Sequence, residues 1–279
     1  MRTIPVVAGA AALAAAVTVL LPAPAHAAVA CNETALITAI DAANAAGGGN
    51  VVLAAGCTYT ITAPHSSDGN GPNALPVITT AITLTGDNNV ITRSTVLLTP
   101  AFRMVEVAGS GNLTVKGNVT LSNGQTLTDG GGILNFGAVT LTSSALTGNT
   151  ALGKGGGLAN TDTAAPATGA TATLTSSTVS GNSAGGRGGG IYNGLRGTLT
   201  TTSSSTSGAN SASQGGGIAA IDSTATTLTS TSVSANSALL TAGGIYRRNG
   251  TMTITTSPIG GNTPNNCTGS SPAVPGCVT

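Results

Sequence analysis

The chain has 279 residues, of which only 6% are charged, and its formal net charge is +1. So weak a charge gives no electrostatic basis for binding nucleic acid or an anionic membrane. Hydrophobic residues make up 40% of the chain, whereas a disordered linker combines low hydrophobicity with high charge, so a folded domain is predicted.

The first predicted segment is a cleavable secretory leader at residues 1–27. Arg2 precedes an apolar run from Ile4 to Leu21, and Ala25-His26-Ala27 then supplies small residues at the positions that a signal peptidase reads. An uncleaved membrane anchor is the alternative, and the A-x-A site favours cleavage. We therefore expect a secreted, extracellular protein that has no membrane attachment after cleavage and whose single domain spans residues 28–279.

An N-terminal cap is predicted for residues 28–62. Asn32 can cap a helix that places Leu36, Ile40 and Ala43 on one face and ends at the glycine triplet that begins with Gly47. Because the open end of a stacked repeat exposes its apolar core, an amphipathic helix is expected to cover that end.

Four cysteines in an exported chain imply two disulfides. Three pairings are possible, and we favour the two pairs that are close in sequence, Cys31–Cys57 and Cys267–Cys277. These pairs would close opposite ends of the domain, and the second would tie down a C-terminal tail at residues 263–279. Both pairs lie outside the repeats, so neither a metal site nor any other cofactor is expected.

A repeat occupies residues 131–262. Five times a glycine pair precedes an aliphatic residue, which we call the first slot, and a second inward position, the second slot, follows it. The distance from the first slot to the second varies between units. The distance from each second slot to the next first slot is the same in every unit. Constant strands and variable loops are typical of a parallel β-helix, and the short Gly-rich segments exclude a helical repeat. Less regular rungs are expected near residues 83–85 and 113–115. The first slots are Ile133, Leu158, Ile191, Ile218 and Ile245, and the second slots are Leu141, Leu174, Thr201, Leu228 and Ile254.

Asparagine recurs at a fixed place after the second slot, as Asn149, Asn182, Asn236 and Asn262. The third unit has Ala209 at that position, and its asparagine comes one place later. Because Asn tolerates left-handed backbone angles and stacked amides can hydrogen-bond along the axis, we predict an asparagine ladder in a turn. A row of amides that binds sugar is the alternative.

Threonine flanks the second slot on both sides in every regular unit. Because side chains alternate across a strand, an inward apolar residue turns both neighbours outward, so the threonines form two files on one face. Three interpretations remain open: the high β-propensity of Thr, an ice-binding face of the T-x-T kind, and an adhesive surface that contacts another protein or the cell wall. The ten residues are Thr140, Thr142, Thr173, Thr175, Thr200, Thr202, Thr227, Thr229, Thr253 and Thr255.

These units resemble a known class of proteins. The stretches from Gly131 to Asn135 and from Gly189 to Asn193, followed by VTLTSSALTGNTA or ATLTSSTVSGNSA, resemble the secreted right-handed β-helix repeat proteins of bacteria. They are also similar to the repeats of polymorphic outer-membrane proteins and, more broadly, to the pectin-lyase-like superfamily. The resemblance implies the fold over about residues 30–279, but this architecture hosts lyases, glycosidases, adhesins and tailspikes alike.

The resemblance implies that an active site, if present, would use carboxylates and basic residues on neighbouring rungs. Asp162 and Asp222 share a register two rungs apart, a backbone separation of about 9.6 Å if each rung rises ~4.8 Å, close to the ~6.5–9.5 Å carboxyl spacing of inverting glycosidases. Arg196 lies between them and Arg248 lies on the last rung. These four residues are the candidate catalytic group, and the alternative is that both aspartates begin Asx-type turns.

The sequence thus predicts an all-β fold, a right-handed parallel β-helix with a short N-terminal capping helix. The predicted function is that of a non-enzymatic secreted scaffold, adhesive or structural, whose partner is a cell-surface protein or glycan. A polysaccharide lyase or glycosidase and an ice-binding protein are the alternative functions.

Overall fold

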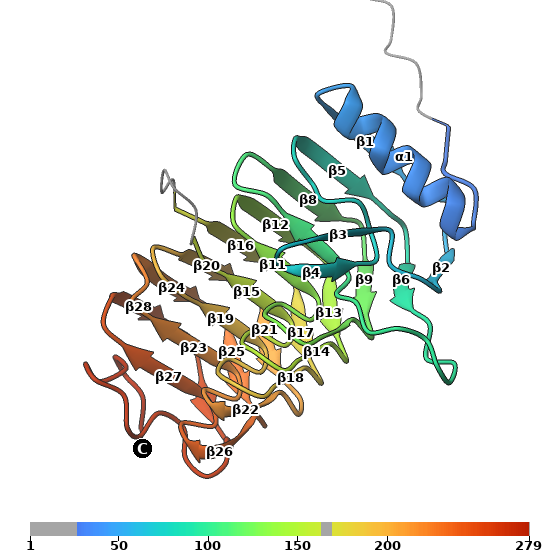
Figure 1. Cartoon of the computed structure of the whole chain (residues 1–279). Coiled ribbons are helices and arrows are strands. Elements are labelled where there is room, and N and C mark those ends of the chain that lie inside the picture. Colours follow the sequence, from blue (N-terminus) through green and yellow to red (C-terminus); the bar gives the residue numbers. More distant parts are fainter. Residues whose placement is uncertain (1–26, 163–168, 279) are drawn as a thin grey trace, which may run out of the picture.

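The computed structural model describes residues 27–162 and 169–278, so the predicted leader, apart from Ala27, lies outside the described residues. The chain winds into stacked coils that form a parallel β-solenoid with one short helix at its start (Figure 1). The predicted fold class is therefore confirmed. Among the described residues, no helix is long and apolar enough to cross a membrane.

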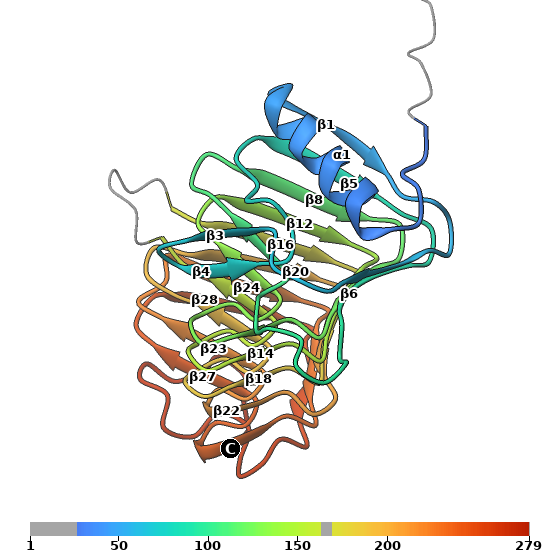
Figure 2. The same ribbon diagram turned by 45° about the vertical axis from the view of Figure 1, so that its right-hand side comes forward.

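Each full coil contributes one strand to each of four parallel sheets, which we number in the order in which the chain meets them (Figure 2). The first sheet contains β1 (Gly48–Val52), β5 (Ala81–Thr85), β8 (Asn112–Lys116), β12 (Ala138–Thr142), β16 (Thr171–Thr175), β20 (Thr198–Thr202), β24 (Ala225–Thr229) and β28 (Thr251–Thr255). The second contains β2 (Thr58–Ile61), β6 (Asn89–Arg93), β9 (Val119–Ser122), β13 (Ala145–Thr147), β17 (Thr178–Ser180), β21 (Ser205–Ser207), β25 (Ser232–Ser234) and β29 (Ile259–Gly260).

The other two sheets are shorter. The third contains β10 (Gln125–Thr126), β14 (Thr150–Ala151), β18 (Ser183–Ala184), β22 (Ser211–Gln214) and β26 (Ser237–Thr241). The fourth contains β7 (Val105–Val107), β11 (Ile133–Asn135), β15 (Leu158–Asn160), β19 (Ile191–Asn193), β23 (Ile218–Ile221) and β27 (Ile245–Arg248). One antiparallel hairpin, β3 (Ser66–Asp68) with β4 (Gly71–Asn73), leaves the first coil after the second-sheet strand β2 and before β5.

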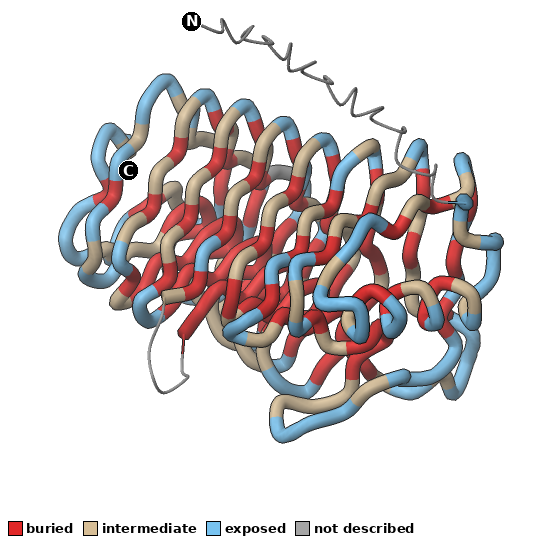
Figure 3. Tube along the Cα trace, turned by 90° about the horizontal axis from the view of Figure 1, so that it is seen from above, coloured by how far each residue is buried: buried red, intermediate tan, exposed pale blue. Residues whose placement is uncertain are grey.

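The predicted slots point into the solenoid, and Figure 3 shows buried positions recurring at matching places in successive coils. In the first sheet, Leu141, Leu174, Thr201, Leu228 and Ile254 pair on consecutive strands, and the first four are at most 1% exposed. The glycine before each first slot has a steric reason. A Cβ on Gly157, for example, would lie 2.6 Å from the carbonyl oxygen of Gly190 on the next coil, so the coils can approach closely only if that position is glycine.

The predicted asparagine ladder is present and buried. The side-chain amide of Asn149 donates to Oδ1 of Asn182 at 3.0 Å, and the same bond joins Asn182 to Asn210 and, at 2.8 Å, Asn210 to Asn236. Asn210 joins the ladder although it comes one place late, because its turn has two left-handed residues, Gly208 with φ +78° and Ala209 with φ +63°, where each other ladder turn has one. The longer turn takes up the extra residue.

A second asparagine ladder lies at the last residues of three fourth-sheet strands, β11, β15 and β19. The amide of Asn135 donates to Oδ1 of Asn160 at 2.7 Å, and that of Asn160 donates to Oδ1 of Asn193 at 2.8 Å. All three side chains are buried. With both ladders, buried amides satisfy backbone groups at two corners of the coil, where the chain turns and the sheets supply no partners.

The predicted capping helix and both predicted disulfides are present. Asn32 caps α1 (Glu33–Ala45), whose buried residues include Leu36, Ile40 and Ala43 and which lies over the first coil. The disulfides Cys31–Cys57 and Cys267–Cys277 are formed, and such bonds are typical of proteins in oxidising compartments.

Candidate functional site

The threonine face is the outer surface of the first sheet. All ten predicted threonines lie there in two files, and each pairs in register with its neighbour on the next strand. One file continues beyond the regular repeat, because Thr83 pairs with Thr114 and Thr114 with Thr140. This file is therefore unbroken over seven strands, from β5 to β28.

The second file is interrupted once. Thr85 pairs with Lys116, which in turn pairs with Thr142. Apart from Lys116, the two files are uncharged from β5 to β28, and most of their threonines are half-exposed. Such a surface offers hydroxyl groups for hydrogen bonds and methyl groups for apolar contact, so it suits an uncharged partner better than a charged one.

The structure brings the candidate catalytic residues together as a stack of alternating charge. The Asp162 side chain is buried, its Oδ2 accepts a hydrogen bond from the backbone N–H of Gly169 at 2.7 Å, and it lies 3.8 Å from Nε of Arg196. The backbone N–H of Arg196 donates in turn to the carbonyl oxygen of Asp222. Asp162 therefore fixes a turn and a neighbouring arginine, which favours the interpretation that it is a turn residue over the interpretation that it is catalytic.

Asp222 is also engaged. Its Oδ1 accepts from the amide of Asn249 and its Oδ2 from Nη2 of Arg248, both at 2.7 Å. The bond from Asn249, followed by that from Arg248, lowers the pKa of the Asp222 carboxyl, whereas a general acid needs a pKa near the working pH. With φ +52°, Asp222 has the backbone of a turn residue.

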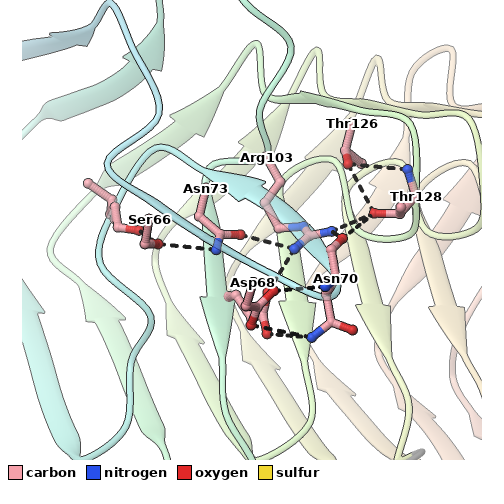
Figure 4. A network of polar contacts seen from close by, with 9 residues as sticks. Ser66, Asp68, Asn70, Asn73, Arg103, Thr126 and Thr128 are labelled. Atoms are coloured by element: carbon pink, nitrogen blue, oxygen red, sulfur yellow. Dashed lines mark hydrogen bonds and ion pairs between the residues drawn. The ribbon is translucent and has the colours of Figure 1, made fainter.

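A buried polar network, not predicted from the sequence, lies beneath the β3–β4 hairpin (Figure 4). Arg103 is fully buried, and its guanidinium donates to Oε2 of Glu106 at 2.8 Å and to Oδ1 of Asn73 at 3.0 Å. The same group donates to the carbonyl oxygen of Asn70 and to Oγ1 of Thr128, both at 2.6 Å. One arginine thus fastens the hairpin to the fourth sheet and to the turn after β10.

Glu106 has the most perturbed acidity in the network. Burial raises its pKa to about 7, and a hydrogen bond with the Asp68 carboxyl acts in the same direction, although the amide of Asn70 and the charge of Arg103 oppose it. Glu106 can therefore hold a proton under mildly acidic conditions. The sequence signal for the network was the presence of Arg103 and Glu106 within the otherwise apolar stretch 101–108.

A small hollow of about 180 Å³ adjoins this network. Glu106 does not line it; its lining residues are Gly69, Asn70, Thr128, Asp129, Leu134, Phe136 and Thr161. Within residues 27–162 and 169–278, no group of three or more His, Cys, Asp or Glu side chains is placed to hold a metal ion. The network is best explained as the set of contacts that holds the β3–β4 hairpin against the solenoid.

Comparisons with protein-family models, curated proteins and solved structures found no match for this chain. The class of the protein is accordingly the one that its fold defines, a parallel β-solenoid closed by two disulfides.

Proposed function

We propose that the protein is a secreted, non-enzymatic β-helix scaffold of the pectin-lyase-like type that binds an uncharged glycan of a cell surface through its threonine face. The single observation that carries the proposal is the file of seven threonines held in register from β5 to β28. The leader pattern and the two disulfides support export. A rigid solenoid presents such a file without any cost of ordering a loop, which favours binding of an extended chain.

The test is a glycan array probed with the wild type and with Thr200→Tyr. We expect the wild type to bind neutral glycans and the variant to bind roughly tenfold or more weakly, a loss of about 1.4 kcal/mol, because the ring blocks the centre of the face. Thr178→Tyr, at an exposed position on the second sheet, is the matched control and should bind as the wild type does. Absence of wild-type binding to every neutral glycan would contradict the proposal.

Ice binding is the second candidate, and the same file favours it. Threonines along a strand lie ~6.6–7 Å apart and successive rungs ~4.8 Å apart, which gives a regular lattice of methyl and hydroxyl groups. Lys116 breaks the second file near its start, so we expect the wild type to show no thermal hysteresis. Faceted ice crystals with the wild type, lost in Thr200→Tyr at unchanged melting temperature, would replace the glycan proposal with this one.

A further inference from the structure

The loop after β6 projects from the side of the solenoid (Figure 1), and three consecutive aliphatic residues lie in it. Val96, Leu97 and Leu98 are between 74% and 91% exposed, and Leu98 has a left-handed backbone with φ +72°. An exposed leucine in that conformation is strained, so the surrounding contacts must hold the loop in place.

Arg93 supplies those contacts. Its guanidinium donates to the carbonyl oxygens of Ser94, Thr99 and Pro100 at 2.9 to 3.2 Å and packs over the ring of Phe102, 5.6 Å from the centroid. The loop is thus a preorganised apolar protrusion whose conformation is set by an arginine at its base, and a protrusion of that kind binds with little ordering cost.

An uncharged groove of about 320 Å³ runs along the third sheet beside the loop. Leu127 and Leu152, 73% and 65% exposed, form its rim, and Ala151 and Ala184 lie within it. Gln125 joins the two features, because it lines the groove and its Oε1 accepts from Nη2 of the loop's arginine at 2.9 Å.

We propose that the protein forms a two-fold dimer in which the loop tip of each copy, Val96–Leu98, occupies the Leu127–Leu152 groove of the other. An apolar protrusion and an apolar-rimmed groove on neighbouring parts of one surface are what an isologous contact requires, because the symmetry axis then creates two equal contacts and closes the assembly at two copies. Aliphatic tip and aliphatic rim are complementary, and neither carries a charge that would have to be desolvated. The threonine face lies on another sheet and stays free, so this inference does not depend on the proposed function.

The test is sedimentation velocity on the full mature chain over a range of concentrations. The wild type should be a dimer, and Leu97→Lys and Leu152→Glu should each weaken dimerisation roughly 30-fold or more, because each places an unpaired charge in both contacts. Leu195→Glu, outside the loop and the groove and also exposed, is the matched control and should remain dimeric. All three variants should still unfold in one cooperative transition, since these side chains lie on the surface, and only the loss of the dimer should lower the apparent melting temperature of Leu97→Lys and Leu152→Glu.

An equimolar mixture of Leu97→Lys and Leu152→Glu gives the decisive measurement. In the mixed dimer, one contact pairs the new lysine with the new glutamate and the other is wild type, so the mixture should dimerise although each variant alone does not. A monomeric wild type, or a mixture that stays monomeric, would overturn the proposal. Flotation of the wild type with neutral phospholipid vesicles, lost in Leu97→Lys, would also overturn it and assign the loop to a lipid surface.

Discussion

We expect the buried asparagine ladder to contribute strongly to stability, and Asn182 at its centre allows this contribution to be measured. The side chain donates to the carbonyl oxygen of Leu146 and to Oδ1 of Asn210, both at 3.0 Å. Its Oδ1 accepts from the backbone N–H of Asn149 at 2.9 Å and from the Asn149 side chain at 3.0 Å. Asn182→Ala therefore removes four buried hydrogen bonds at once.

The expected cost follows from that count. Each net hydrogen bond is worth about 1 kcal/mol, and a buried group left without a partner costs about 1–3 kcal/mol. Asn182→Ala should therefore lower the free energy of unfolding by about 4 kcal/mol, because it also leaves the backbone N–H of Asn149 and the carbonyl oxygen of Leu146 without these partners in a place closed to water.

The assay is urea unfolding followed by circular dichroism, with Asn112→Ala as the control. Asn112 is exposed on the outer face of β8, so the same substitution there should change the free energy of unfolding by less than ~0.5 kcal/mol. If Asn182→Ala costs no more than the control, the ladder would not stabilise the coil and the reasoning would be refuted.

Two further predictions concern the core and the buried network around Arg103 and Glu106. Leu174→Asp should abolish cooperative thermal unfolding because it buries an unpaired charge between two coils, whereas Thr173→Asp, on the outer face, should lower the melting temperature only slightly. The folded state holds the Glu106 proton more tightly than the unfolded chain, whose Glu pKa is about 4.3. The free energy of unfolding should therefore fall by on the order of 3 kcal/mol as the pH rises from ~4 through 7, and Glu106→Gln should remove that slope in a pH series of urea titrations.

The regular rungs of the fold could be predicted because the spacing of the glycines and the apolar slots repeats with the period of the coil. The constant step from each second slot to the next first slot belongs to strands that must pair with the next coil, so it specifies register directly. The place of Asn210 could not be predicted in this way. Its turn is one residue longer than the other ladder turns and is left-handed at both Gly208 and Ala209, and only the folded coil shows that this longer turn returns Asn210 to the ladder.

The candidate site likewise has a part that the repeat spacing predicts and a part that it does not. Ten threonines were predicted from the repeat, while Thr83 and Thr114 were not, because the upstream rungs lack its spacing. The network around Arg103 and Glu106 was missed because most of its partners lie far away in sequence. Asn70 and its hairpin belong to the preceding coil, so only the folded solenoid brings them together.

The two eight-stranded sheets of the same molecule provide an internal comparison for the threonine face. If β-propensity alone placed threonine at outward positions, the second sheet should carry it as often as the first. Its matching file instead reads Ala145, Thr178, Ser205 and Ser232 on consecutive strands, and serine and alanine are not strand formers of the same rank. The coils tolerate several small residues at outward strand positions, so the unbroken threonine file on the first sheet exceeds what strand formation requires. That excess is the reason to seek the binding partner at this face.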